Sequence, residues 1–155
     1  MRTVNDWLNE YGESHKNETN KLIHWLCVPA IFFSIIGLLY SVKLPWEIKA
    51  GFQLNMAIIV ALLAILYYFR LSPPLAVGLV LFIGLCFFLC RIIEINSPVS
   101  LWVVSVAIFI LAWAGQFYGH KIEGKKPSFL KDIQFLLIGP MWLMSFIYRK
   151  LGFRF

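Results

Sequence analysis

Four long stretches without any charged residue constrain this chain more than any other feature of its sequence. None of them contains Asp, Glu, Lys or Arg, and they cover residues 22–42, 50–69, 71–90 and 95–120. An α-helix needs about 20 mostly apolar residues to cross the hydrocarbon core of a bilayer. The pattern therefore predicts four transmembrane helices, at about residues 22–42, 52–70, 74–93 and 97–119.

The composition of the chain agrees with a membrane protein. Hydrophobic residues make up 60% of the 155 residues and charged residues only 14%, against about 45–50% and about 25% in soluble domains. So few charged side chains could not cover a surface in water, which argues against a soluble enzyme, a disordered tail and a nucleic-acid-binding protein. We therefore expect a single all-α membrane domain over residues 1–155, in contact with membrane lipid and without a nucleic-acid partner.

Two shorter helices are expected outside the spans. Residues 4–13 have the spacing of an amphipathic helix, with Trp7, Leu8 and Tyr11 on one face. The apolar stretch near the C-terminus is short for a span, and Gly139-Pro140 interrupts it. Residues 129–149 are therefore expected to form an interfacial or re-entrant helix.

The distribution of Lys and Arg predicts the orientation of the spans. Four spans place both termini on one side of the membrane, and that side carries eleven of the fourteen Lys and Arg residues. The other side has only Lys43, Lys49 and Arg91. By the positive-inside rule both termini are expected in the cytoplasm, which means the inner membrane of a bacterium or the endoplasmic reticulum of a eukaryote.

The polar residues of this apolar chain are concentrated in two tracts, and these tracts contain all three histidines. His15 and His24 lie where the first span begins, and His120 lies where the fourth span ends. With four spans, both tracts lie at the same face of the membrane. The sequence therefore predicts that every imidazole of the protein lies at one membrane depth, and ionisable residues at such depths are functional candidates.

Helical spacing places the polar side chains of each tract on one face. Each tract contains a set of three polar residues, spaced at i, i+3, i+7 in the first tract and at i, i+4, i+7 in the second. The two sets are Asn17, Asn20 and His24, and Gln116, His120 and Glu123. Two such faces turned toward each other would bring imidazole, carboxylate and amide groups to one point.

The position of His15 requires a break in the backbone. On a continuous helix His15 would be out of phase with His24, so both can serve one site only if the helix begins between them. The run Asn17-Glu18-Thr19-Asn20 is a plausible break, because Asn and Thr favour helix caps and turns. Gly115 and Gly119 form a G-x-x-x-G step that would allow another helix to approach closely beside His120.

These residue types indicate a metal site. Two histidines and a carboxylate with open coordination positions form the facial triad of non-haem iron enzymes, and zinc is also compatible with them. The side chains of these types in the two tracts are those of His15, His24, His120 and Glu123, which are the candidate catalytic residues. The amides of Asn17, Asn20 and Gln116 would orient these ligands or bind a substrate carboxylate.

Two other classes of function are open from the residues alone. His24 and His120 at one depth are compatible with the two axial ligands of a b-type haem, while the sequence has no c-type attachment motif. A non-enzymatic membrane scaffold is the other class. The sequence motifs of serine hydrolases, P-loop nucleotide hydrolases, dinucleotide-binding folds and zinc proteases are absent.

The two polar tracts resemble a known family, the small membrane proteins related to the fungal 2-hydroxy fatty acid dioxygenase. The resemblance rests on the tract from His15 to Pro29 and on Gln116-Phe-Tyr-Gly-His120-Lys-Ile-Glu123-Gly-Lys-Lys-Pro127. Asp132, Pro140 and the segment 149–153 fit the same pattern, and the four apolar stretches match in order and approximate length. The similarity covers nearly the whole chain. It departs from the fungal pattern at His15-Lys16, where the fungal enzyme has two adjacent histidines.

The resemblance implies an iron(II)-dependent dioxygenase that shortens a 2-hydroxy fatty acid by one carbon in fatty acid α-oxidation. It implies His15, His24 and His120 as metal ligands, and Glu123 as a ligand or as a carboxylate that orients one. The expected cofactor is Fe(2+), with zinc as the metal that a purified sample could contain. The expected partners are a 2-hydroxy fatty acid, whose apolar tail stays in the bilayer, and dioxygen.

Overall fold

The computed structural model describes residues 2–49, 52–124 and 135–155. Within them the chain is predominantly helical, as the sequence predicted. The helices are α1 Val4–Gly12, α2 Glu18–Ser41, α3 Met56–Leu71, α4 Pro73–Asn96, α5 Leu101–Glu123 and α7 Ile138–Lys150. The expectation of an all-α fold needs one correction, because α2 and α3 are joined by an antiparallel hairpin of β1 Lys43–Lys49 and β2 Phe52–Asn55.

Three of the described helices, α2, α4 and α5, are long and apolar enough to cross a membrane. The second predicted span began too early: residues 52–55 form β2, and the side chain of Asn55 caps the helix that follows by accepting from the N–H of Ile58 at 3.3 Å. The resulting helix α3 has 16 residues. At about 1.5 Å per residue it measures about 24 Å, less than the roughly 30 Å of a hydrocarbon core.

An ion pair attaches the hairpin to α4. Lys43 at the start of β1 forms an ion pair with Glu94 of α4 at 2.6 Å, and Arg91 one turn earlier on α4 reaches the same carboxylate at 3.0 Å. The hydroxyl of Tyr40 in α2 donates to Glu94 as well, at 3.3 Å. These contacts hold the end of α2 and the start of β1 against α4.

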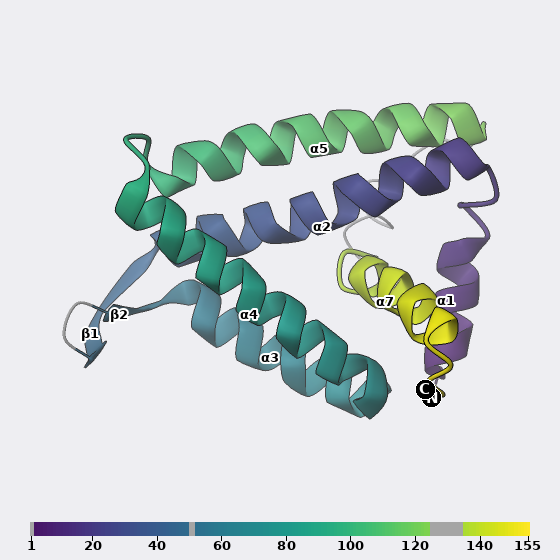
Figure 1. Ribbon diagram of the computed structural model, residues 1–155, viewed down its shortest axis with the longest axis horizontal. Helices are drawn as coiled ribbons and strands as arrows, with labels where there is room; N and C mark the ends of the chain where they lie inside the picture. Colours follow the sequence, from purple (N-terminus) through teal and green to yellow (C-terminus); the bar gives the residue numbers. More distant parts are fainter. Residues whose placement is uncertain (1, 50–51, 125–134) are drawn as a thin grey trace.

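The helices form two pairs that diverge from each other (Figure 1). Helices α2 and α5 run side by side, and α3 and α4 form the second pair. Helix α7 lies between the open ends of the two pairs, where it contacts α4, α2 and α1. The N-terminal ends of α1 and α2 and the ends of α5 and α7 are therefore gathered at one end of the molecule.

Small residues allow α2 and α5 to pack closely. A Cβ at Gly115 would lie 2.7 Å from the sulfur of Cys27, and a Cβ at Gly119 would overlap the side-chain oxygen of Asn20. The close approach predicted from the G-x-x-x-G step is therefore confirmed. Since backbones can approach this closely only where a side chain is missing, the two glycines determine how near the two polar tracts come to each other.

Adding a methyl group at Gly119 is expected to destabilise the protein. The amide of Asn20 cannot move away easily, because it donates to the carbonyl oxygen of Ser14 at 3.2 Å and to Glu123 at 3.1 Å. Overpacking costs about 1–3 kcal/mol, so the thermal midpoint of Gly119→Ala in detergent should fall by about 5 °C. Gly84→Ala is the matched control, since a Cβ there meets nothing within 4 Å. An equal fall in both variants would contradict the argument.

The predicted amphipathic N-terminal helix is confirmed as α1. Its first turn has a capping box in which Thr3 and Asp6 exchange hydrogen bonds. The N–H and the hydroxyl of Thr3 both donate to the carboxylate of Asp6, and these bonds hold the pKa of Asp6 below its usual value. Leu8 and Tyr11 are buried on the face of α1 that packs against α7.

The C-terminal helix of residues 129–149 is observed in part. Residues 129–134 lie outside the described residues, and α7 begins at Ile138. Ile138, Met141 and Trp142 are buried, so this helix packs into the protein. The hydroxyl of Tyr68 in α3 donates to the carbonyl oxygen of Leu137 at 3.0 Å, which anchors the beginning of α7. Whether the helix is interfacial or re-entrant stays a prediction.

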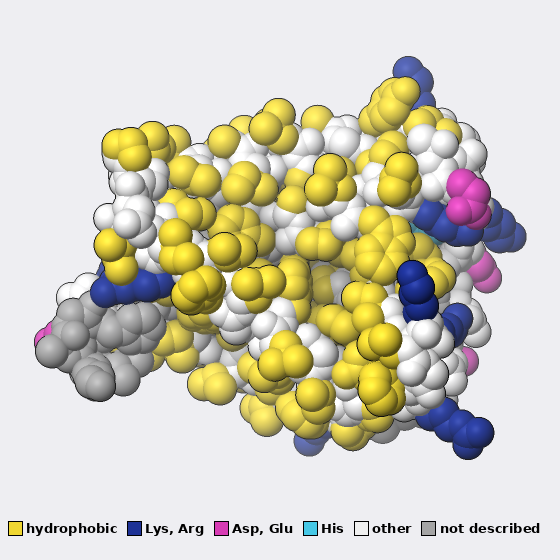
Figure 2. All heavy atoms as spheres, in the orientation of Figure 1, with side chains coloured by type: hydrophobic (Ala, Val, Ile, Leu, Met, Phe, Trp, Pro, Cys, Tyr) yellow, Lys and Arg dark blue, Asp and Glu magenta, His cyan; other side chains and the backbone are white. Residues whose placement is uncertain are grey.

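The surface agrees with association with a membrane. In Figure 2 hydrophobic side chains cover the broad middle of the visible face, while most charged side chains lie toward its ends. Large apolar side chains on α2, α3, α4 and α5 are exposed in the isolated chain, among them Leu26, Leu63, Leu81 and Leu111. A soluble monomer rarely exposes apolar patches of this extent, so the middle of the molecule fits a lipid environment.

Candidate metal centre

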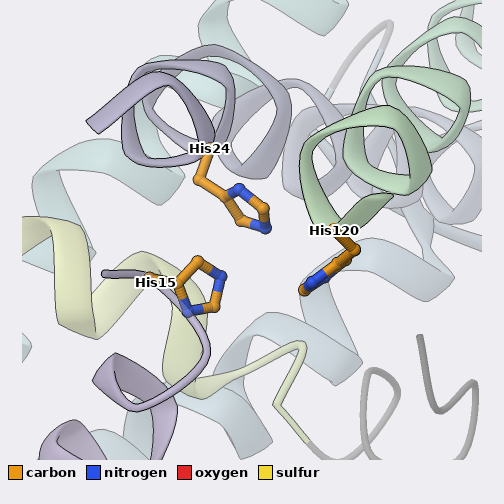
Figure 3. A group of neighbouring side chains, drawn as sticks. All are labelled: His15, His24 and His120. Atoms are coloured by element: carbon orange, nitrogen blue, oxygen red, sulfur yellow. The ribbon is translucent and has the colours of Figure 1, made fainter. Parts of the chain in front are cut away.

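The structure brings the three histidines together from three separate segments. His15 lies in the turn between α1 and α2, His24 on α2 and His120 on α5, and their rings converge on one point (Figure 3). One ring nitrogen from each lies within 4.8 Å of the others. All three side chains are buried, at 4%, 0% and 6% exposure. We call this arrangement the three-His group.

The backbone break predicted before His24 is present. Helix α2 begins at Glu18, and Asn17 caps it by accepting hydrogen bonds from the N–H groups of Thr19 and Asn20, at 2.9 and 3.2 Å. His15 is therefore outside the helix, and its ring can turn back toward His24. A continuous helix would have directed the two rings to different sides.

Backbone carbonyls orient two of the rings. The Nδ1–H of His15 donates to the carbonyl oxygen of Tyr11 at 2.6 Å, and that of His24 donates to the carbonyl oxygen of Asn20 at 2.9 Å. A carbonyl can only accept, so Nδ1 carries the proton in both rings and Nε2 carries the lone pair. This is the tautomer that a histidine adopts when it binds a metal through Nε2.

A polar atom without a partner supports a ligand at this point. The Nε2 of His24 is fully buried and has no hydrogen-bond partner among the described residues. A buried acceptor in that state costs about 1–3 kcal/mol unless something binds to it. A metal ion held by the three imidazoles would satisfy it, and mutual repulsion between protonated rings at this separation favours the neutral forms that bind metals.

Aromatic side chains from α1 and α7 pack against His15, one member of the three-His group. The ring of Tyr11 stacks on His15 with centroids 4.3 Å apart and planes 11° apart, and the ring of Trp142 lies 5.2 Å from His15. His15 itself contacts His24, at 4.2 Å between centroids, and His120, at 5.6 Å. The stacking fixes the ring that has no helix to hold it.

Glu123 forms hydrogen bonds with the turn that carries His15. Its carboxylate accepts from the backbone N–H groups of Lys16 and Asn17, both at 2.9 Å, and from the side-chain amide of Asn20 at 3.1 Å. It does not belong to the group of side chains close enough to hold one ion, as far as the described residues go. The carboxylate thus fastens the turn of His15 to the end of α5.

The three predicted amides lie in different places. Asn20 is fully buried and links Glu123 to the carbonyl oxygen of Ser14, whereas Asn17 is the cap of α2. Gln116 is buried on α5 one turn before His120. Asn17 and Asn20 therefore shape the approach of the two helices, and Gln116 is the amide of the three that lies on the helix of His120.

Sequence reasoning did not identify Tyr11 or Trp142 as part of the site. Tyr11 had been placed only on the apolar face of α1, and Trp142 lies in the C-terminal apolar stretch. The signal for Tyr11 is its spacing of four residues from His15, which suits an aromatic contact across a helix end. No sequence signal marks Trp142, because its contact with His15 depends on how α7 packs against α1.

Comparisons with known proteins point to one family. The family model described as 2-hydroxy-palmitic acid dioxygenase Mpo1-like matches residues 1–151. Among curated proteins, the chain is similar to the 2-hydroxy-palmitic acid dioxygenase MPO1 of Saccharomyces cerevisiae, with 29% identity over 149 residues that cover 94% of this chain and 80% of the yeast protein. No solved structure matches the chain at a significant level.

Proposed function

The chain belongs to the Mpo1-like family, and from that premise we propose that it is a dioxygenase that acts on 2-hydroxy fatty acids at a metal ion held by the three-His group. The family match confirms the resemblance found in the two polar tracts. The observation that carries the proposal is the burial of three imidazoles whose ring nitrogens lie within 4.8 Å of one another.

The metal we propose is iron(II). Imidazole ligands suit both iron and zinc, but zinc has no redox chemistry, and a dioxygenase has to reduce dioxygen. Bound iron(II) would supply that redox chemistry. The ring of His15 contacts the rings of both His24 and His120. A haem with His24 and His120 as axial ligands would need room for its flat macrocycle between their two rings. The contacts of His15 therefore support a small ion.

The reaction we propose removes one carbon from the acid. Atoms balance without a further reductant if one dioxygen converts the 2-hydroxy acid into the acid shorter by one carbon, carbon dioxide and water. The carbon–carbon bond next to the carboxylate breaks, and the carbon that carried the hydroxyl is oxidised to the new carboxyl group. Both oxidised carbons come from the substrate, so dioxygen is the oxidant and no second substrate is needed.

The residues around the group have separate roles in this proposal. The carbonyls of Tyr11 and Asn20 hold two rings in the ligating tautomer, and the rings of Tyr11 and Trp142 cover part of His15. The amide of Gln116 is buried on α5 one turn before His120, which supports a role in orienting that ligand. Exclusion of water strengthens these electrostatic contacts.

We propose that the protein is embedded in the membrane with both termini in the cytoplasm. The long apolar helices α2, α4 and α5 support the embedding. The two termini lie at the same end of the molecule (Figure 1), and the excess of Lys and Arg on their side supports the orientation. Such a placement would leave the alkyl chain of the substrate in the lipid and its polar head at the end of the molecule where the three-His group lies.

The test is a single-substrate conversion. Protein purified in an uncharged detergent is loaded with iron(II) without oxygen, and then receives oxygen and 2-hydroxypalmitate. Pentadecanoate, the C15 acid, is expected by mass spectrometry. Palmitate, which lacks the hydroxyl, is the control substrate and should remain unchanged, and the zinc-loaded protein should give no C15 acid. If the iron-loaded protein leaves 2-hydroxypalmitate unchanged, the proposal is wrong.

A further inference from the structure

A pocket of about 520 Å³ lies beside the three-His group. Its walls come from α1, from the turn that carries His15, from the first turn of α2 and from α7. The volume falls within the roughly 300–1,000 Å³ of small-molecule sites. His15 lines the pocket and also belongs to the three-His group, so the pocket extends up to the candidate metal centre.

One part of the pocket wall is basic. Lys16, Lys21 and Arg149 line it, against the single acid Glu13. Lys21 pairs with Glu18 at 2.8 Å, but none of the ion pairs within the described residues involves Lys16 or Arg149. The guanidinium of Arg149 lies over the ring of Phe155, 5.6 Å from its centroid. Two cations from segments far apart in the sequence thus face one cavity, an arrangement that attracts an anion.

The other part of the wall is apolar. Leu8 of α1 and the rings of Trp142 and Phe146 on α7 line the pocket next to the basic side chains. The pocket therefore offers positive charge and hydrocarbon contact together, and it ends at a histidine of the candidate metal centre. This combination matches a molecule with one anionic head and one alkyl chain.

We propose that the pocket recognises the carboxylate of a single-chain fatty acid, with Lys16 and Arg149 as its charged contacts. The inference rests on the proposed function for the identity of the acid, since a 2-hydroxy acid needs a route to the three-His group. Lys16 and Arg149 hold the carboxylate, the apolar wall takes the first part of the chain, and the acid meets the three-His group at His15.

Binding of palmitate to the metal-free protein tests the pocket without any catalysis. Palmitate has no 2-hydroxyl and, without metal, nothing to chelate. Calorimetric titration in an uncharged detergent at low salt should show that Lys16→Gln and Arg149→Gln each weaken palmitate binding about tenfold, as loss of one charged hydrogen bond predicts. Hexadecanol, which has the same chain without the charge, should bind the parent and both variants equally.

Lys150→Gln is the matched control. Lys150 follows Arg149 on α7 and is exposed, but it does not line the pocket, so this variant should bind palmitate like the parent. Lys16 and Arg149 are also exposed, so both variants are expected to fold, which the helical circular dichroism checks. In the iron-loaded enzyme the two pocket variants should raise KM for 2-hydroxypalmitate and leave kcat near the parent value.

Three outcomes would overturn the assignment of the pocket. One is equal binding of palmitate and hexadecanol by the parent protein. Another is a loss in Lys150→Gln as large as that in Arg149→Gln. The third concerns displacement of bound palmitate. If vesicles of phosphatidylglycerol displace it and other C16 fatty acids do not, the basic wall binds a lipid headgroup. Charge-dependent palmitate binding by a protein that does not convert 2-hydroxypalmitate would support the pocket and contradict the proposed function.

Discussion

His24→Ala is expected to lower the affinity for iron(II) about 100-fold or more and to remove formation of the C15 acid. His24 is the fully buried member of the three-His group, and its Nε2 has no other partner among the described residues. Loss of a residue that only orients a ligand already costs about 10–100-fold in metal affinity, so loss of a ligand should cost at least as much. Metal titration followed by thermal unfolding measures the affinity directly.

The same experiment has a readout that does not depend on activity. A metal that binds the folded protein raises its unfolding temperature, by an amount that follows from its affinity. Iron(II) should therefore raise the midpoint of the parent and of Lys121→Gln, an exposed neighbour of His120, and should raise that of His24→Ala far less at the same iron concentration. His24→Gln, which is closer in size, separates loss of the ligand from loss of packing. Parental iron binding in both His24 variants would refute the three-His centre.

Glu123→Ala is expected to weaken iron binding by about 10–100-fold although its carboxylate is outside the three-His group. Lys16, Asn17 and Asn20 would lose the oxygen atoms to which they donate, and the turn that positions His15 would no longer be fastened to α5. Glu123→Gln keeps one acceptor oxygen in the same place, so its loss of affinity should be clearly smaller than that of Glu123→Ala.

Hydrogen exchange distinguishes fastening of the turn from direct ligation. If Glu123 positions the turn, the backbone amides of Lys16 and Asn17 should exchange faster in metal-free Glu123→Ala than in the metal-free parent, since they lose the acceptor of their hydrogen bonds. The sequence offered both roles for Glu123, as ligand and as orienting carboxylate. A Glu123→Gln variant that binds iron as poorly as His24→Ala, with parental exchange at these amides, would make the carboxylate a ligand.

The helical part of the fold could be predicted from the sequence because its signal is local. A stretch such as 73–96 is apolar over a length that suits a membrane, and its prolines mark its first turn, so α4 was expected nearly as it is observed. The hairpin could not be predicted in this way. Its strands pair across a turn and are held to α4 by the charges of Lys43 and Glu94, which lie far apart in the sequence.

The sequence could predict the site only as far as the order of the spans determines the membrane depth of each histidine. With an even number of spans, the beginning of the first and the end of the last lie at one face, which predicted one membrane depth for His15, His24 and His120. That their ring nitrogens meet is shown only by the structure. The contacts that shape the centre were not predictable, because they come from packing between elements. Tyr11 and Trp142 reach His15 only after α1 and α7 have packed together.

The sequence by itself predicted association with a membrane, the long apolar helices and a common end of the molecule for the three imidazoles, because apolar length and the positions of scarce polar residues are properties of single segments. Tertiary structure decided which atoms meet. It turned His15 back toward His24 through the cap at Asn17, and it engaged Glu123 with the turn of His15. These outcomes depend on directional hydrogen bonds and on the close approach of α2 and α5 at Gly119, which form only when distant segments are already in contact.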